Sequence, residues 1–147
     1  MIIYEGEGNL LDLECQTTVC TVNCVKVMGK GIALDMRDAI PGLQDFYNRL
    51  CTRNHLKPGD IAIYRVPDTD RQILIFATKL HWKHSSKYMW IADGLRSIAH
   101  RYQELGITEL GLCPLGCGCG GLNFEIVREQ IHYELGSKHP LRTKIYC

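Results

Sequence analysis

Short apolar runs alternate with segments of helical periodicity along most of the chain, and this alternation constrains the fold more than any other sequence feature. It is typical of an α/β domain in which helices cover a mostly parallel sheet. The stretch PDTD at residues 67–70 predicts a turn between two of the strands. The strand candidates are Ile2–Tyr4, Val19–Val22, Ile61–Val66, Ile73–Thr78, Leu110–Pro114 and Thr143–Tyr146.

The clearest helical pattern covers Tyr88–Leu105, whose apolar residues recur every three or four positions and predict a core-facing side. A second pattern begins after Asn123, a predicted N-cap, and ends at Gly136, a predicted C-terminal stop. Its apolar positions are Phe124, Val127, Ile131 and Leu135. Two shorter helices are predicted over Ile32–Ala39, which Pro41 ends, and over Leu43–Asn54.

The length of 147 residues and the 46% hydrophobic content favour one domain over residues 1–147. A net charge of +1 excludes an electrostatic field of the whole protein that would attract it to a nucleic-acid duplex or an anionic membrane. Any anion-binding site must therefore be local. There is no secretion signal and no run of eighteen apolar residues. We therefore expect a cytoplasmic monomer without membrane contact, and no further domain because the chain ends soon after the fold is complete.

Eight cysteines would suggest a disulfide framework in a secreted chain, but the export signal is missing. Cys20, Cys24 and Cys113 lie in or beside strand candidates, where a reduced cysteine behaves as a small apolar residue. Cys113, Cys117 and Cys119 cluster as zinc ligands would, yet they form no CxxC pair and no histidine follows at zinc-finger spacing. The sequence therefore predicts no metal and no cofactor.

Two glycine-rich segments each join a predicted strand to a predicted helix. The first, TVNCVKVMGKGIALDM at residues 21–36, passes through Gly29, Lys30 and Gly31. The second, CPLGCGCGGLNFEIV at residues 113–127, repeats the arrangement. Glycine lets a ligand approach the backbone, and a helix N-terminus offers unpaired N–H groups to an anion.

Either loop alone is explained equally well by turn geometry. Ligands of open α/β sheets bind beyond the carboxyl ends of the strands, so two such loops would clasp an extended ligand, for which a diphosphate is the natural candidate. No Gly-Lys-Ser/Thr triplet is present, which excludes a Walker motif. Gly116, Gly118 and Gly121 satisfy GxGxxG, but no acidic residue follows at the ribose-binding offset, so nicotinamide chemistry is not expected.

The string VNCVKVMGKGIAL, followed by Pro41, resembles the first ligand loop of macrodomains of the DNA ADP-ribosyl glycohydrolase antitoxin type. It is also similar to the related class that removes ADP-ribose from acidic side chains. The segments GNLLD (8–12), ATKLHW (77–82) and PLGCGCGGLNF (114–124) agree in order and spacing, and the match covers roughly residues 1–135. The resemblance implies a three-layer α/β/α macrodomain with a mixed, mostly parallel sheet and a cleft for ADP-ribose.

The resemblance also assigns positions in the cleft. Asn9 and Leu10 would lie near the adenine, although Asn9 is equally explained as a turn residue, and Asn23 would bind the distal ribose. The first loop would wrap the distal ribose and diphosphate with Gly29, Lys30, Gly31 and Ile32. The second loop and the flanking positions would contribute Thr78, Trp82, Pro114, Leu115, Gly116, Cys117, Gly118, Cys119 and Gly120.

Lys79 directly follows an apolar strand, so it should reach the same edge as the two loops. In the resembled families a lysine here carries catalysis, by attacking the anomeric carbon or by assisting departure of the attached group, with Asn23 beside it. The alternative is a solvated lysine at a strand end. The neighbouring His81, Trp82, Lys83, His84 and Lys87 would suit single-stranded DNA, or form an ordinary charged loop.

Departures from the family pattern distinguish among the activities found in the resembled families. Relatives that act on protein acyl esters pair their lysine with an acidic residue in the second loop, and residues 115–122 contain none. Lys26 stands where the family usually has glycine. These features favour an ADP-ribosyl glycohydrolase acting on modified nucleobases in DNA. The alternatives are a non-catalytic ADP-ribose reader and an ADP-ribose 1″-phosphate phosphatase.

Overall fold

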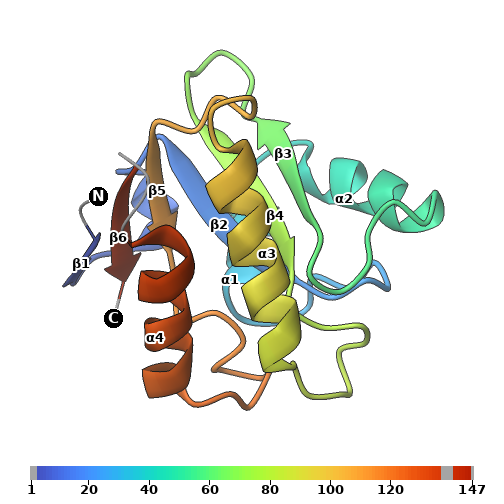
Figure 1. Cartoon of the computed structure of the whole chain (residues 1–147). Coiled ribbons are helices and arrows are strands. Elements are labelled where there is room, and N and C mark those ends of the chain that lie inside the picture. Colours follow the sequence, from blue (N-terminus) through green and yellow to red (C-terminus); the bar gives the residue numbers. More distant parts are fainter. Residues whose placement is uncertain (1–2, 137–140, 147) are drawn as a thin grey trace.

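The computed structural model of the chain describes residues 3–136 and 141–146 (Figure 1). None of the helices within these ranges is long and apolar enough to cross a membrane. The strands in the described ranges are β1 (Ile3–Gly6), β2 (Thr17–Val22), β3 (Ile61–Arg65), β4 (Gln72–Ala77), β5 (Glu109–Leu112) and β6 (Arg142–Tyr146). The helices there are the short 3-10 helix η1 (Leu10–Asp12) and the α-helices α1 (Gly31–Ala39), α2 (Leu43–Thr52), α3 (Tyr88–Arg101) and α4 (Phe124–Leu135).

The strands form one sheet in the order β1-β6-β5-β2-β4-β3. β3 is antiparallel to β4, and every other neighbouring pair is parallel. The predicted mixed, mostly parallel sheet is confirmed. Because the five parallel strands share one direction, their carboxyl ends meet at one edge of the sheet, where the loops after β2, β4 and β5 begin.

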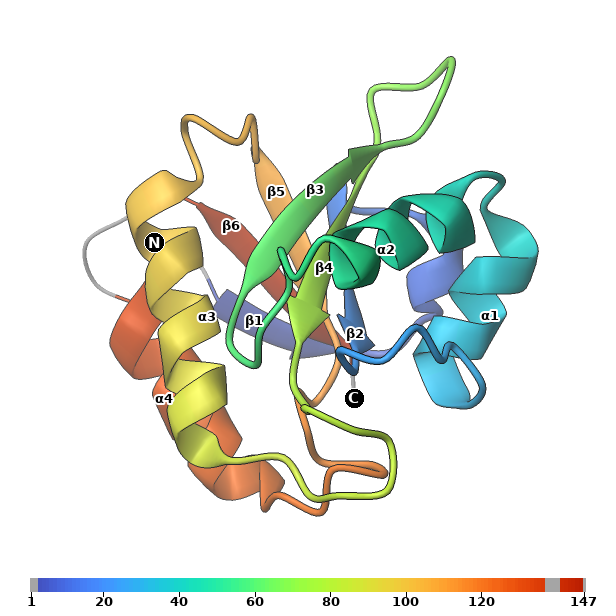
Figure 2. The same cartoon turned by 90° about the vertical axis from the view of Figure 1, so that its right-hand side faces the viewer.

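Helices cover both faces of the sheet, with α1 and α2 on one side and α3 and α4 on the other (Figure 2). One apolar cluster lies under α1 and α2 and includes Met36, Tyr47 and Ile75. A second lies under α3 and α4 and includes Ile91 and Ile131. The three-layer prediction is confirmed, and burial of β4 on both faces explains why its sequence is a continuous apolar run.

The predicted elements all form, but some ends differ. The helix predicted to reach Leu105 ends at Arg101. The chain turns after this residue, and Gly106, at the end of the turn, has a φ of 72°. Likewise α2 ends at Thr52, and β5 ends at Leu112, so Cys113 and Pro114 belong to the following loop. The predicted turn at residues 67–70 joins β3 to β4. Ile2, the predicted first residue of β1, lies outside the described residues.

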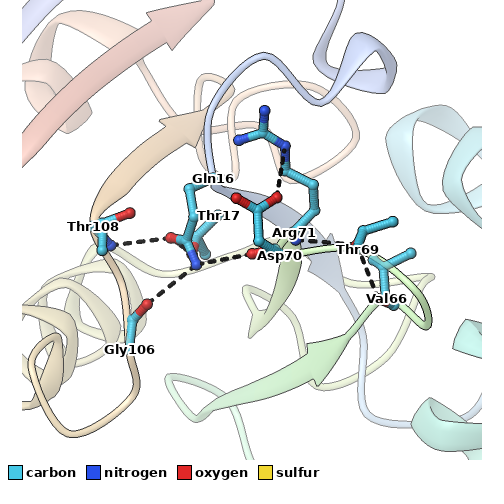
Figure 3. Close-up of polar contacts among 8 residues, drawn as sticks. All are labelled: Gln16, Thr17, Val66, Thr69, Asp70, Arg71, Gly106 and Thr108. Carbon is cyan, nitrogen blue, oxygen red and sulfur yellow. Dashed lines mark hydrogen bonds and ion pairs between the residues drawn. The ribbon is translucent and has the colours of Figure 1, made fainter.

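At the amino edge of the sheet, the side chain of Gln16 joins three segments (Figure 3). Its amide nitrogen donates to the carbonyl oxygens of Asp70 (3.3 Å) and Gly106 (3.1 Å). Its oxygen accepts from the backbone N–H of Thr108 (3.0 Å) and from the hydroxyl of Thr17 (2.6 Å). This network fixes the β3–β4 hairpin and the turn between α3 and β5. The two glycine loops lie at the opposite edge of the sheet.

Candidate functional site: a cleft at the carboxyl edge of the sheet

A cleft of about 1020 Å³ opens at the carboxyl edge of the sheet. Its walls come from three segments that are far apart in the sequence: the end of β2 with the first glycine loop, the loop after β4, and the second glycine loop after β5. Its volume is at the upper end of that of small-molecule sites, which suits an extended ligand of nucleotide size.

Most of the residues predicted for the site line this cleft. They are Asn23, Gly29, Lys30, Gly31, Ile32, Thr78, Lys79, Trp82, Pro114, Gly116, Gly118, Cys119 and Gly120. The other four predicted residues are not among the lining residues. Leu10 and Leu115 are buried in the two apolar clusters, and Cys117 donates its thiol to the carbonyl of Leu115. Asn9 caps η1, because its side chain accepts from the N–H of Leu11 at 2.9 Å.

The lining also contains residues that sequence reasoning did not assign to it: Thr21, Val22, Val27, Ala33, Lys83 and Cys113. Val22 and Cys113 each directly precede a residue that was assigned to the site at a strand end. Their position in the sequence could therefore have identified them as lining residues. Nothing in the local pattern distinguishes Val27 from a core residue, and yet 40% of it is exposed.

The buried amide of Asn23 organises the first glycine loop. Its oxygen accepts from the phenol of Tyr47 (2.7 Å) and from the N–H of Val25 (3.0 Å), and its nitrogen donates to the carbonyl of Val27 (2.8 Å). Sequence reasoning expected a partner for this amide in a ligand hydroxyl, whereas the loop and α2 already supply partners. An amide nitrogen has two hydrogens, so one N–H is left for a ligand.

The N-terminus of α1 meets the cleft without a side-chain cap. Lys30 is the N-cap residue and makes no capping hydrogen bond. Gly31, the first helical residue, has a φ of 58°, and the position where a side chain would begin is open space. The first N–H groups of α1 therefore lack a capping side chain, and they lie where an anion in the cleft would gain from the helix dipole.

Lys79 is buried, with only 9% of its surface exposed, so the interpretation as a solvated strand-end lysine is wrong. Its ammonium donates to the carbonyl of Trp82 at 3.3 Å, and its own carbonyl accepts from the thiol of Cys24. Within residues 3–136 and 141–146 no carboxylate forms an ion pair with Lys79. A buried cation without an acidic partner favours an anionic or electron-rich ligand beside it.

The second glycine loop is folded tightly on itself and on the start of α3. A side chain at Gly120 would begin 2.3 Å from the carbonyl oxygen of Gly116, so no other residue fits without a backbone shift. The carbonyl of Gly120 accepts from the N–H of Ser86 at 3.0 Å. Gly118, by contrast, faces open space, which leaves room for a ligand against the loop backbone.

Two thiols of the second glycine loop, those of Cys113 and Cys117, are poor metal ligands. Loss of contact with water raises the pKa of Cys113 to about 11 and also raises the pKa of Cys117, so both are protonated near neutral pH. Across the part of the chain that the structure describes, no group of three or more metal-binding side chains comes together. The cleft is therefore interpreted through its backbone N–H groups, Asn23 and its lysines.

The three segments around the cleft are basic although the chain as a whole is nearly neutral. Residues 23–34, 79–92 and 113–124 contain no Asp or Glu and five lysines: Lys26, Lys30, Lys79, Lys83 and Lys87. The remaining sequence has 12 basic residues (17 minus 5) against all 16 acidic ones. Charge is thus segregated along the sequence, and a neutral total does not argue against an anionic ligand here.

Comparison with known proteins agrees with this geometry. The Macro domain family model matches residues 19–131. The DNA ADP-ribosyl glycohydrolases of Thermus aquaticus and Mycobacterium tuberculosis are each 38% identical, over 95% and 89% of this chain and over 39% and 38% of their own lengths. The chain thus spans about two fifths of the length of these curated relatives.

Solved structures extend the similarity. The macrodomain of Thermus aquaticus DarG is 36% identical, with a TM-score of 0.91 over 99% of this chain and 98% of that one. Thermosipho africanus DarTG in complex with ADP-ribose is 32% identical, with a TM-score of 0.91 over 97% of this chain and 40% of that one. The similarity in structure therefore covers almost the whole chain, including all three segments around the cleft.

Proposed function

The chain belongs to the Macro domain family, and we propose that it binds ADP-ribose in the cleft and hydrolyses mono-ADP-ribose conjugates, with ADP-ribosylated nucleobases in DNA as substrates. The observation that carries the proposal is the buried Lys79, which lies between two glycine loops and has no carboxylate partner among the described residues. The proposal is supported by similarity to enzymes named DNA ADP-ribosyl glycohydrolase and to a DarTG structure in complex with ADP-ribose.

In the proposed complex the diphosphate lies between the open N-terminus of α1 and the backbone of the second glycine loop. Both elements present N–H groups, which suit phosphate oxygens. The free N–H of the Asn23 amide would donate to a hydroxyl of the distal ribose. The adenine would extend toward Asn9 and Leu10, beyond the residues that line the cleft.

The reaction breaks the bond between the anomeric carbon of the distal ribose and the base, and adds the elements of water across it. None of the described residues that line the cleft carries a carboxylate, so proton transfer and nucleophilic attack would depend on Lys79. Two roles fit its position: attack by the neutral amine on the anomeric carbon or its opened form, and proton donation to the departing base. Either role needs the side chain beside the ligand, and Lys79 is buried in the lining of the cleft.

The test compares release of ADP-ribose from mono-ADP-ribosylated single-stranded DNA and from mono-ADP-ribosylated protein, assayed side by side. We expect turnover of the DNA conjugate to be the faster, and Lys79→Ala to abolish it. Lys79→Arg is the matched variant. It keeps the positive charge and yet can act neither as base nor as nucleophile, so it should lose turnover as well. Turnover that survives in both variants would rule out the lysine mechanism.

A non-catalytic reader is the alternative that a specific observation supports, because the Lys79 ammonium is engaged by the Trp82 carbonyl at 3.3 Å. Tight binding of ADP-ribose without release from either conjugate would identify a reader. As part of the same proposal, we assign the protein to the cytoplasm as a monomer that engages single-stranded DNA as its macromolecular substrate.

A further inference from the structure

The β4–α3 loop, residues 78–87, is fixed at both ends to the glycine loops. Near its start, the carbonyl of Leu80 accepts from the N–H of Cys24 in the first loop at 3.2 Å. Near its end, the N–H of Ser86 donates to Gly120 in the second loop at 3.0 Å. Figure 2 shows the β4–α3 loop beside the loop between β5 and α4. The segment between these ties is therefore held across the mouth of the cleft.

This segment and the first loop expose large apolar side chains. Trp82 is 50% exposed and Leu80 is 55% exposed, and in the first loop Val25 and Val27 are 37% and 40% exposed. Trp82 also lines the cleft. An indole that is half exposed on a fixed loop, in the lining of a cleft, is typical of a surface that stacks on a flat ligand.

The groups around the indole are cationic or polar. The ammonium of Lys83 lies 5.1 Å from the centre of the Trp82 ring, and the ring of His81 lies 5.3 Å from it. The three segments around the mouth carry five lysines and no carboxylate. The charge favours an anionic partner, and the exposed indole favours one with accessible aromatic faces. A single-stranded nucleic acid combines both properties, whereas a duplex buries its base faces.

We propose that Trp82 is the stacking platform for a base of a single strand, and that Lys83 binds a flanking phosphate. The inference rests on the proposed function, because it places this base next to the modified nucleotide whose ADP-ribose enters the cleft. The Lys79 ammonium lies 3.3 Å from the Trp82 carbonyl, so the platform and the reacting group are adjacent. The β4–α3 loop thereby selects conjugates that lie within a strand.

The first test measures binding of an unmodified single-stranded oligonucleotide of about ten nucleotides by fluorescence anisotropy. Trp82→Ala should weaken binding about ten-fold, and Trp82→Phe should restore most of the loss because it keeps an aromatic face. Tyr133→Ala removes an aromatic ring that is 82% exposed on α4 and serves as the matched control. Equal affinity of wild type and Trp82→Ala would overturn the inference.

The second test measures the salt dependence of the same binding. Lys83→Ala should reduce the slope of log K against log salt by about 0.7, the value for one phosphate contact on a single strand. Arg71→Ala, which removes a charge from the β3–β4 hairpin at the opposite edge of the sheet, should leave the slope unchanged. Equal binding of a duplex of the same sequence would also overturn the inference.

These binding tests separate the inference from the proposed reaction, because neither requires turnover. Binding of the strand that depends on Trp82, without release of ADP-ribose, would support the platform and contradict the hydrolase. Where turnover is present, kcat/KM for an ADP-ribosylated oligonucleotide should fall about ten-fold in Trp82→Ala relative to that for the ADP-ribosylated mononucleoside. An unchanged ratio would contradict the platform while leaving the hydrolase intact.

Discussion

The phenol oxygen of Tyr47 lies 2.7 Å from the side-chain oxygen of Asn23 and 2.8 Å from its carbonyl oxygen. Tyr47 is fully buried in α2, and burial raises the pKa of its phenol well above the ordinary value, so the group stays protonated and donates. The first glycine loop is thus tied to a helix on one face of the sheet. The orientation of the Asn23 amide depends on a residue that does not line the cleft.

Tyr47→Phe should therefore weaken ligand binding through the loop. Loss of the phenol leaves the buried oxygen of Asn23 without one of its partners, which should destabilise the protein by about 1–3 kcal/mol. We expect a several-fold weaker affinity for ADP-ribose, because the loop must then be ordered by the ligand. Denaturant unfolding and calorimetric titration measure the two effects.

Tyr64→Phe is the matched control for that measurement. Its phenol donates to the carbonyl of Pro41 at 2.7 Å, so this change also removes one hydrogen bond between a tyrosine and the backbone. It should leave ADP-ribose affinity unchanged, because neither Tyr64 nor Pro41 lines the cleft. An equal loss of affinity in both variants would show that general destabilisation, and not the tie to Asn23, is responsible.

Gly120→Ala should disrupt the second loop. The added carbon would begin 2.3 Å from the backbone oxygen of Gly116 and 2.4 Å from the Ser86 hydroxyl, so the loop backbone must move. We expect a thermal midpoint several degrees lower, and ADP-ribose affinity reduced by about ten-fold or more, since misplaced donors no longer meet the diphosphate. Gly118→Ala enters open space and should keep the wild-type midpoint. Similar melting of the two variants would contradict the packing argument.

Local patterns predicted the α/β alternation and the two glycine loops, and the resemblance to macrodomains predicted the three layers and most of the residues that line the cleft. An apolar strand followed by glycines and a helix identifies a loop at the carboxyl edge wherever it occurs, as at Gly29 and Gly116. The contacts of Tyr47 and Gln16 were not predictable, since each joins segments far apart in the chain and neither residue departs from an ordinary core or surface pattern.

At Lys26 the departure from the family pattern coincides with an unusual backbone conformation. Its φ is 68°, the left-handed conformation that glycine adopts with little strain, and the family usually has glycine at this position. Lysine is exposed there and adds one of the five positive charges around the cleft. Sequence reasoning identified the substitution, but only the backbone geometry explains why glycine suits the position.

Lys144 and Tyr146 of β6 both donate to one oxygen of Glu14, which lies shortly before β2 in the chain. The hydrogen bond from Lys144, followed by its charge, lowers the pKa of the Glu14 carboxyl below its ordinary value of 4.5. A lowered folded-state pKa contributes stability above pH 4.5 that is lost as pH falls through the folded value.

Glu14→Gln should therefore melt at a lower temperature than wild type near neutral pH, where it leaves the ammonium of Lys144 without its ion pair. The two melting curves should converge as the pH falls from 4.5 through the lower folded-state pKa of Glu14, because the wild-type carboxyl then becomes neutral as well. Thermal melting over a pH series measures this, and a constant gap between the two proteins down to acid pH would show that the Glu14 charge contributes nothing.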